Sequence, residues 1–388
     1  MTTTAAVYTD RPDSEGAGRH LGLQVREALA AEQPDALIVF ASSRFNYEAL
    51  LSAIDAECSP KLIVGSSSAG EFTAAQRGEG TACALAIRST DIQVSGGLGL
   101  NVSLNRVQAA QDVVAGFRGL SAREFPYRSA LIMTDALAGH ADDLVEELTV
   151  LTSGKYQFAG GGAGDDAKFT QTHVFYGTKA HTDAVVALEL LSLKPLGIGV
   201  GHGWTPAGKA LRVTEAIGMR LVSLNGVPAV EAFEEHARTT AQPFDRQAPL
   251  PFFLHNILGI DTHSGHRLRV PLAVNADGSI NCAAEIPSGA RVHIMKATAD
   301  SAIVAATKAT ESAVHALKGE KPGAALFFDC VATRLRMGEV FGFELESVAR
   351  TLGDVGLVGC NTYGQIARAE GQFGGFHNCT AVVMVLPA

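Results

Sequence analysis

The chain has few aromatic residues and no excess of positive charge, and both shortages limit what it can bind. Phe, Trp and Tyr together make up 6% of the 388 residues, which argues against a protein-docking module because aromatic side chains dominate docking faces. The 31 Lys and Arg residues are outnumbered by 40 Asp and Glu residues, which gives a formal net charge of −9. This acidic balance, without a basic block, argues against a nucleic-acid binder.

Cysteine pairs and long apolar runs are also missing. The six cysteines contain no CxxC pair, and most of them lie in or next to apolar runs, where thiols usually act as small core side chains. No stretch reaches the roughly 18 apolar residues of a membrane span, and the N-terminal MTTT lacks the features of a secretory signal. We therefore predict a reduced, cytoplasmic protein without a zinc site or a membrane span, with a disulfide-bonded protein as the alternative.

Glycine and apolar side chains are abundant instead. The chain contains 41 glycines, 47% hydrophobic residues and 18% charged residues, a composition that is typical of a folded protein with a large core and many turns. Such a chain suits a cradle for a small molecule. At roughly 150 residues per domain, its length favours two domains.

The order of apolar patterns in the first part predicts a mixed α/β protein. Continuous apolar runs at 36–41 and 61–65 are typical of strands covered on both faces. Helical spacing of apolar residues predicts helices over 18–31 and 45–56. Several short strands between 173 and 216, with few helices among them, predict an antiparallel meander.

The second half repeats this mixture. Asp-Gly at 277–278 predicts a hairpin, and helices over 299–317 and 339–352 flank a buried strand at 324–328. We expect an α/β (mixed α+β) fold, with two layered domains of mixed, partly antiparallel sheets flanked by helices. The expected divisions are an N-terminal segment and helix at 1–34, a first domain at 35–241 and a second at 242–388.

Residues 65–71 (GSSSAGE) form the first segment that could carry chemistry. The segment follows a predicted buried strand, and the ends of such strands are where α/β proteins bind small molecules. In neither register does it match the nucleophile elbow G-x-S-x-G. We expect the serine hydroxyls and the carboxylate to face a ligand, with a turn of small residues needed for packing as the alternative. The residues concerned are Ser66, Ser67, Ser68 and Glu71.

Residues 160–166 (GGGAGDD) form the second glycine-rich segment. It is not a Walker P-loop, because no GK[ST] follows. Repeated glycines let backbone N–H groups converge on an anion, which makes Gly161, Gly162 and Asp165 candidate ligand contacts. They equally let two sheets approach closely, and this alternative stays open. Nucleotide binding is not supported, because residues 197–203 fail G-x-G-x-x-G in each register.

Two of the twelve histidines differ from the rest. His202 and His377 have glycines around them, which predicts space for a planar ligand, so either could be an axial ligand of haem. A lone histidine is more often exposed or hydrogen-bonded in the core. The pair at 263 and 266 is too loosely embedded for a metal site, and no H-E-x-x-H occurs.

An enzyme is a further alternative. Cys360, at the end of a predicted strand, or Ser68 would then be the nucleophile, with His377 as the base. A cysteine nucleophile also needs an oriented base, which a sequence alone cannot show. We therefore expect no catalytic residues.

Several segments, in this order, resemble the FIST family, whose members carry paired FIST N and FIST C domains. The N-terminal resemblance rests on VFASS at 39–43, GSSSAGE at 65–71, GGAGDD at 161–166, GHGWTPAG at 201–208 and VTEA at 213–216. The C-terminal resemblance rests on FFDCVATR at 327–334, GCNTYGQI at 359–366 and FHNCT at 376–380. It covers about residues 35–386, and the order and spacing of the motifs carry it.

Three positions depart from the family pattern. Residues 332–333 (AT) stand where the family tends to have Gly-Arg, although Arg334 follows directly. Gln365 replaces an acidic residue, and residues 255–256 (HN) fall where an arginine is frequent. The resemblance therefore implies a ligand site that is less charged than usual, which weakens the expectation of an amino-acid-like zwitterion.

The resemblance implies a sensory module rather than an enzyme. Family members are thought to bind small ligands such as amino acids, and to work with histidine kinases, chemoreceptors or cyclic-di-nucleotide enzymes. Some bacterial members bind haem and sense nitric oxide. This chain would signal through a separate partner, and a scaffold with a vestigial pocket is the remaining alternative. The expected pocket joins the first-half residues to Arg334, Tyr363, Gln365 and His377.

Overall fold

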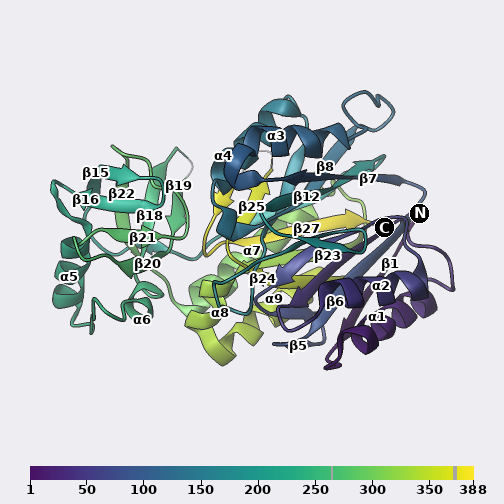
Figure 1. The fold of residues 1–388 in the computed structure, drawn as a ribbon, viewed down its shortest axis with the longest axis horizontal. Helices are drawn as coiled ribbons and strands as arrows, with labels where there is room; N and C mark the ends of the chain where they lie inside the picture. The colour runs from purple at the N-terminus through teal and green to yellow at the C-terminus, as the bar shows by residue number, and fades with distance from the viewer. Residues whose placement is uncertain (264, 370–373) are drawn as a thin grey trace.

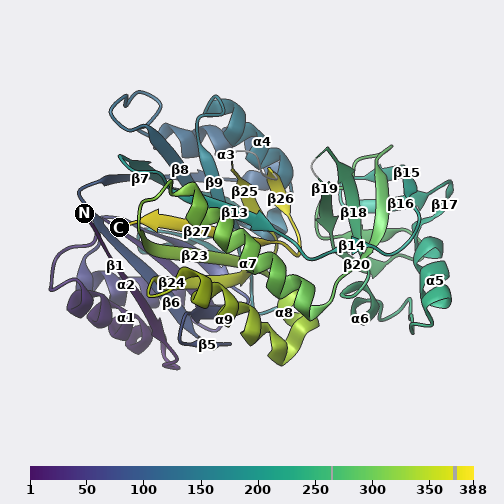
Figure 2. The same ribbon diagram turned by 180° about the vertical axis from the view of Figure 1, so that it is seen from behind.

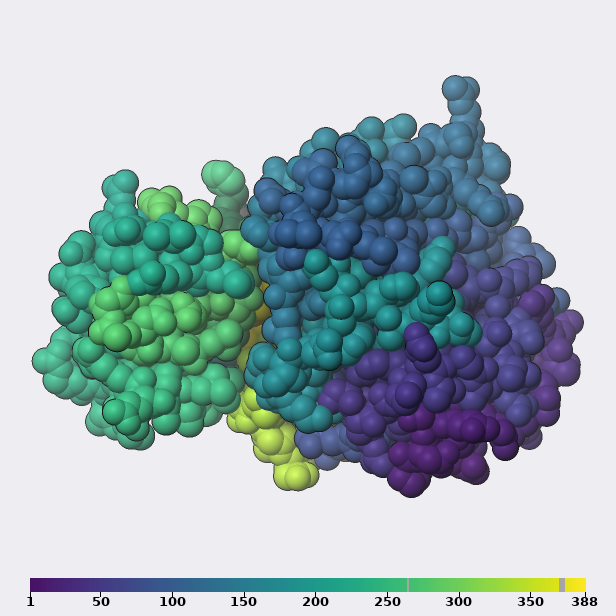
Figure 3. Space-filling view, in the orientation of Figure 1, coloured from purple at the N-terminus to yellow at the C-terminus, as the bar shows by residue number. Residues whose placement is uncertain are grey.

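The computed structural model describes residues 1–263, 265–369 and 374–388. They form a large body with a smaller lobe beside it (Figure 1; Figure 3). The lobe comprises residues 205–296 and is inserted between β13 (Gly197–Gly201) and α7 (Ala299–Ala316). The mixed sheets flanked by helices confirm the predicted fold class.

Three six-stranded sheets with a common strand order make up the body. Each sheet is centred on a parallel pair, with antiparallel strands on both sides of that pair. In the first sheet the pair is β2 (Ala36–Ser42) and β3 (Ile63–Ser68), with α2 (Tyr47–Cys58) between them in the chain. Every residue of these two strands is buried, as their apolar character predicts.

The same unit occurs three times along the chain, and we call the units repeats. The first sheet has the order β1-β6-β2-β3-β10-β11 and adds β1 (Thr2–Thr9), β6 (Ala82–Ser89), β10 (Val174–Tyr176) and β11 (Lys179–His181). The second has the order β26-β25-β9-β8-β12-β7, with β7 (Ile92–Leu100), β8 (Tyr127–Thr134), β9 (Gln157–Gly162), β12 (Ala184–Ser192), β25 (Gln365–Arg368) and β26 (Gly375–His377). The third has the order β13-β27-β23-β24-β4-β5, with β4 (Glu71–Thr73), β5 (Arg77–Gly78), β23 (Pro322–Cys330), β24 (Gly356–Thr362) and β27 (Ala381–Pro387).

A short hairpin leaves each repeat and joins the sheet of another. The β4–β5 hairpin of the first repeat pairs with β24 in the third sheet. The β10–β11 hairpin of the second repeat pairs with β3 in the first sheet, and the β25–β26 hairpin of the third repeat pairs with β9 in the second sheet. This cyclic exchange brings the three glycine-rich segments at 65–71, 160–166 and 359–366 against one another.

Helices cover the outer faces of the sheets, and one core fills the space between the inner faces. Phe40, Leu188 and Phe328 belong to this shared core, one from each sheet. On the outside, two helices pack on each sheet, and Figure 2 shows the pair on the third sheet. These helices are α1 (Ser14–Ala28) and α2 on the first sheet, α3 (Val102–Ala115) and α4 (Ala141–Leu151) on the second, and α7 and α9 (Phe341–Leu352) on the third.

Glycines at equivalent positions of the three repeats allow neighbouring strands to approach closely. A Cβ atom at Gly65, Gly160 or Gly359 would lie 1.8, 2.0 or 2.2 Å from a carbonyl oxygen of the adjacent strand. Gly65 and Gly160 also have φ values of 156° and 140°, which side-chain-bearing residues rarely adopt. At Gly160 the close approach is between two strands of one sheet, so the approach of two sheets, left open for the 160–166 segment, stays a prediction.

The lobe is built on one nine-stranded sheet. Its core lies between this sheet and two helices, α5 (Ala229–Thr240) and α6 (Leu250–Phe253). The hairpin predicted at Asp-Gly 277–278 is confirmed as β20 (Pro271–Val274) and β21 (Ile280–Cys282). The other strands are β14 (Thr205–Pro206), β15 (Leu211–Ile217), β16 (Arg220–Leu224), β17 (Val227–Pro228), β18 (Ile257–Thr262), β19 (Gly265–Arg269) and β22 (Arg291–Lys296).

The predicted antiparallel meander between residues 173 and 216 is wrong. The expected strands exist, but they belong to four different sheets. Local apolar runs identify the strands, whereas the exchange of hairpins between repeats determines their partners. The divisions expected at residues 34 and 241 stay predictions. Within the described ranges, no helix has both the length and the apolar character needed to cross a bilayer.

Candidate functional site

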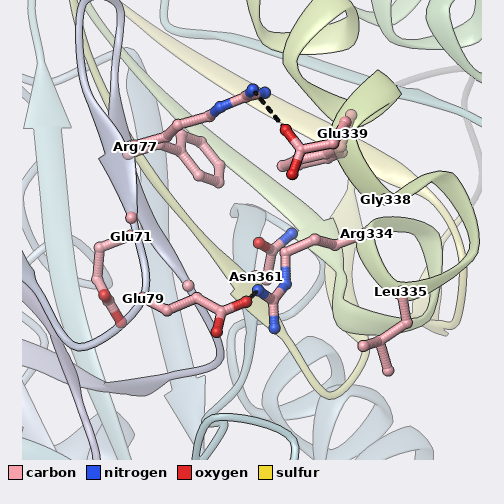
Figure 4. A pocket seen from close by; sticks show the side chains of 12 residues that line it. Glu71, Arg77, Glu79, Arg334, Leu335, Gly338, Glu339 and Asn361 are labelled. Carbon is pink, nitrogen blue, oxygen red and sulfur yellow. Dashed lines mark hydrogen bonds and ion pairs between the residues drawn. The ribbon is translucent and has the colours of Figure 1, made fainter.

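A pocket of about 380 Å³ opens between the β4–β5 hairpin and the segment α8 (Val331–Met337), η2 (Gly338–Val340) and α9 (Figure 4). The first repeat supplies the hairpin and the third repeat supplies the helices, so the pocket joins distant parts of the chain. Its lining consists of Gly70, Glu71, Phe72, Arg77, Gly78, Glu79, Arg334, Leu335, Gly338, Glu339, Phe341 and Asn361.

Strand exchange positions the base of the pocket. Glu71 in β4 lies opposite Cys360 in β24, and the next residue of β24, Asn361, is bonded to the turn before β4. The Asn361 N–H donates to the Gly70 carbonyl at 2.8 Å, and the Ala69 N–H donates to the Asn361 carbonyl at 2.9 Å. These bonds fix the Asn361 side chain at the pocket wall.

Two buried donors at this wall have no acceptor in the part of the chain that the structure describes. The Nε of Arg334 and the Nδ2 of Asn361 are both buried, and neither has a hydrogen-bond partner among the described residues. Gly70 lies between these side chains, because a Cβ there would be 2.8 Å from the Asn361 Oδ1 and 3.6 Å from the Arg334 Nε. A buried donor without a partner is unfavourable, so the wall is arranged to receive an acceptor.

Charges of both signs line the pocket. At one end the Arg334 guanidinium forms an ion pair with Glu79, whose side chain is 73% exposed. At the other end Arg77 lies 3.9 Å from the fully exposed carboxylate of Glu339. Figure 4 shows these two pairs at opposite ends of the hollow. The pocket can therefore bind an anionic group and a cationic group of one ligand.

Glu71 is a buried carboxyl at the base of the pocket. It accepts hydrogen bonds from the Ser68 hydroxyl, from the Thr81 N–H at 3.2 Å and from the Thr81 hydroxyl at 2.7 Å. Burial disfavours the charged form and raises the pKa of Glu71 to about 7 despite these donors. The group can therefore gain or lose a proton near neutral pH.

The other predicted first-half residues lie behind the pocket. Ser66, Ser67 and Ser68 are completely buried. The Ser67 hydroxyl donates to the His173 carbonyl at 3.3 Å and accepts from the His173 N–H at 2.9 Å, which attaches the 65–71 segment to the second repeat. Of the four residues predicted in this segment, Glu71 lines the pocket.

The predicted anion-binding nest is occupied by the protein itself. The Gly162 N–H donates to the Gly364 carbonyl at 2.8 Å, and Gly161 pairs with Gln365 in the exchanged sheet. Asp165 accepts the Tyr363 hydroxyl and three backbone N–H groups of residues 169–171. These residues hold the second and third repeats together.

Gln365 and His377 lie away from the pocket, next to each other in the β25–β26 hairpin. The Gln365 amide donates to the Thr362 hydroxyl at 2.8 Å and accepts from the Thr380 N–H at 3.2 Å. Burial, with Arg267 and other cationic groups nearby, lowers the pKa of His377 to about 3. Its imidazole is therefore neutral at physiological pH.

The glycines around His202 do not open space for a planar ligand, so that interpretation of the sequence is wrong there. A Cβ at Gly203 would lie 2.2 Å from the Ser301 carbonyl, and one at Gly201 would lie 2.9 Å from the Ala305 carbonyl. Both glycines instead allow β13 and the following turn to approach α7. The cavity beside His202 holds about 10 Å³, which is less than a haem needs.

The two candidate nucleophiles are held in the interior. Cys360 is completely buried, and burial raises the pKa of its thiol well above the usual value, which suppresses the thiolate. The Ser68 hydroxyl donates to Glu71. All six cysteines are free and buried.

Glu71 and Arg334 are the pocket-lining residues that could be expected from the sequence. Asn361 carried a signal, since it is a polar residue that directly follows an apolar run within the quoted 359–366 motif. Arg77 and Glu79 carried none, because they lie in a short polar hairpin whose partner strand is almost 300 residues away in the chain.

Comparisons with known proteins agree with the resemblance. A FIST N domain model matches residues 35–227, and a FIST C domain model matches residues 229–368. FIST domains are generally sensory domains that bind small ligands in signalling proteins. No curated protein sequence matches the chain.

Two solved structures show weak likeness. Cyanuric acid hydrolase from A. caulinodans is 7% identical over 100% of both chains, with a TM-score of 0.37. PurLQS from Thermotoga maritima is 12% identical over 100% of this chain and 72% of that chain, with a TM-score of 0.25. Neither score is high enough to inform the assignment. The two family models match in tandem and together span most of the chain, so this protein belongs to the FIST family.

Proposed function

We propose that this protein is a sensor that binds a small carboxylate-bearing molecule, of amino-acid type, in the pocket between the β4–β5 hairpin and α8. The observation that carries the proposal is the pair of buried donors, Arg334 Nε and Asn361 Nδ2, which have no acceptor among the described residues and line one wall. A carboxylate supplies two acceptor oxygens, and arginine binds it through parallel N–H groups.

Ligand binding would replace an exposed ion pair with a more enclosed one. Arg334 is paired with Glu79, whose side chain is 73% exposed, and such exposed pairs contribute little to stability. A ligand carboxylate can therefore displace Glu79 at small cost. The released Glu79 carboxylate would then face the ligand's amino group, which explains why the wall carries both signs of charge.

The same exchange of partners couples binding to conformation. Glu79 follows β5 in the first repeat, whereas Arg334 lies in α8 of the third repeat. A ligand held between them favours one spacing of the hairpin and the helix, because a ligand shifts an equilibrium only through different affinities for the two states. Output would pass to a separate partner, with a histidine kinase, a chemoreceptor or a cyclic-di-nucleotide enzyme as the classes implied by the family. The free thiols favour a reducing cytoplasm as the site of action.

Thermal unfolding with defined probes tests the proposal. The probes are the twenty L-amino acids, the matching amino acid amides without a free α-carboxylate, and simple mono- and dicarboxylates. At a concentration of about 100 times Kd, a bound probe stabilises the protein by about 2.7 kcal/mol. We expect stabilisation by at least one carboxylate, none by its amide, and loss of the effect in Arg334→Ala and Asn361→Leu.

The matched control is Arg246→Ala, because Arg246 also forms an exposed pair, with Glu234 in the lobe. This variant should respond like the wild type. Stabilisation that persists in both pocket variants, or no stabilisation by any probe in the wild type, would contradict the proposal.

A further inference from the structure

We propose that the lobe contains a binding site for a divalent transition-metal ion, with Zn²⁺ as the best-fitting ion, formed by Asp261, His266 and His293. The three residues come from adjacent antiparallel strands, β18, β19 and β22. Asp261 lies directly opposite His266, whereas His293 lies opposite Gly259, two residues before Asp261. Side chains two residues apart in a strand share a face, so the sheet directs all three toward one point.

The two Asp–His distances match those of a tetrahedral site. The Oδ1 of Asp261 lies 3.3 Å from the Nε2 of His266 and 3.3 Å from the Nε2 of His293. All three potential ligand atoms lie within 4.8 Å of one another. Zinc bonds of about 2.0–2.2 Å at a tetrahedral angle place ligand atoms about 3.3 Å apart. An ion fits between these atoms with small side-chain movements.

Neighbouring groups orient two of the ligands. The Nδ1 of His293 lies 3.4 Å from the Gly208 carbonyl, which favours the proton on Nδ1 and leaves the lone pair of Nε2 directed at Asp261. Arg291 holds the other carboxylate oxygen, with its Nε 3.0 Å from the Asp261 Oδ2. Metal-binding histidines usually donate their second ring N–H to a carbonyl or carboxylate, as the Gly208 carbonyl allows for His293. Two facing lone pairs need a cation between them, either a proton or a metal ion.

Exposure of the cluster leaves room for a further ligand. The side chains of Asp261, His266 and His293 are 31%, 24% and 12% exposed, so an ion can enter from solvent and keep one water-filled position. Three protein ligands with an open fourth position are typical of accessible zinc sites. A zinc site was not expected from the sequence, because cysteine spacing and histidine motifs gave no sign of one and no motif links residues 261, 266 and 293.

Metal titration of the full chain after EDTA treatment tests this inference. We expect isothermal titration to show one tight equivalent of Zn²⁺, and Co²⁺ to give the intense visible bands of a tetrahedral complex. The variants His266→Ala and His293→Ala should each weaken Zn²⁺ binding at least about tenfold. The control His263→Ala removes a nearby histidine from the same β18–β19 hairpin and should bind like the wild type.

Three results would overturn the site. In the first, His266→Ala and His293→Ala bind Zn²⁺ as tightly as the wild type. In the second, the control His263→Ala loses as much Zn²⁺ affinity as they do. In the third, the wild type takes up no Zn²⁺ at micromolar concentration. In each case a proton-bridged ion pair would account for the cluster. If a variant fails to fold, the wild-type Co²⁺ spectrum decides, because a weak octahedral spectrum contradicts the site. The residues differ from those of the pocket, so this test is independent of the proposed sensor function.

Discussion

At the scale of single residues, the pocket places a carboxyl group where water hardly reaches it. Glu71 is 1% exposed, and its donors are Ser68 and Thr81. Burial raises its pKa to about 7, so the folded protein retains this proton at pH values where an unfolded chain has already lost it. Glu71 therefore makes the stability of the protein depend on pH.

The substitution Glu71→Gln should remove this dependence. Between about pH 4.5 and pH 7 the folded state binds more protons at this position than the unfolded state, so rising pH lowers the free energy of unfolding of the wild type. The difference in pKa corresponds to about 3 kcal/mol. We therefore expect the free energy of unfolding of Glu71→Gln, minus that of the wild type, to increase from pH 5 to pH 8 by up to this amount. Urea unfolding of both proteins at each pH measures this difference.

The comparison isolates Glu71 because other buried carboxyl groups titrate in both proteins. Asp329, for example, has its pKa raised by burial. If the free energies of unfolding of the two proteins keep a constant difference from pH 5 to pH 8, Glu71 does not titrate in this range.

Predictability at this scale depends on whether a residue carries a local signal. Glu71 could be identified because it follows a buried strand, and α/β proteins bind small molecules at such strand ends, whereas Arg334 was expected only from the family resemblance. The serines of the 65–71 segment follow the same rule, yet all three are buried, and the Ser67 and Ser68 hydroxyls donate to groups of the protein itself. Sequence shows that a polar group lies at a strand end, but it does not show which side of the chain faces the solvent.

At the scale of elements, the three repeats depend on neighbouring strands that approach closely where a glycine leaves no side chain in the way. Gly65, Gly160 and Gly359 lie in the second strand of each parallel pair. Because one hairpin of each repeat joins the sheet of another repeat, distortion at one of these strands would affect two repeats. The glycines are therefore needed for the pairing of the exchanged hairpins as well as for the packing of their own strands.

The substitution Gly65→Ala tests this role. Its Cβ would lie 1.8 Å from the Val39 carbonyl, and φ at this position is 156°. We expect a loss of about 3 kcal/mol or more in the free energy of unfolding, at the upper end of what overpacking costs. Gly208→Ala is the control, since a Cβ there would meet no atom of the described residues within 4 Å, and its effect should stay within about 0.5 kcal/mol. If both variants lose a similarly small amount of free energy of unfolding, β2 and β3 can move apart at Gly65 without cost.

Element prediction succeeded where the signal was local. The helix expected over 299–317 is α7 (Ala299–Ala316), and the strand expected over 36–41 is β2 (Ala36–Ser42). The meander failed because strand partners are not encoded in the strands themselves. The hairpins β10–β11 and β25–β26 pair with strands of another repeat, and no periodicity along the chain records that choice.

At the scale of the whole molecule, an ion pair joins the lobe to the body. Arg269 of β19 is 1% exposed and pairs with Asp142 of α4. Its guanidinium also donates to the Glu285 carbonyl at 2.8 Å and to the Phe376 carbonyl at 3.1 Å. A charged group this deeply enclosed requires its partner, because the alternative is an uncompensated buried charge.

The substitution Asp142→Ala should therefore destabilise the protein. Removing one partner of a buried pair typically costs about 3–5 kcal/mol, whereas Glu234→Ala, which breaks the exposed pair with Arg246, should cost about 0–1 kcal/mol. Urea unfolding of both variants provides the comparison. Equal losses would mean that the Arg269–Asp142 pair does not hold the lobe against the body.

The central claim, that the pocket between the β4–β5 hairpin and α8 holds a small carboxylate ligand, is tested most directly by native mass spectrometry of the gently purified protein. We predict that wild type and Arg246→Ala carry a small molecule with a carboxylate, released and identified on denaturation, and that Arg334→Ala and Asn361→Leu carry none. The same molecule retained at equal occupancy by all four proteins would place the ligand elsewhere and contradict the account.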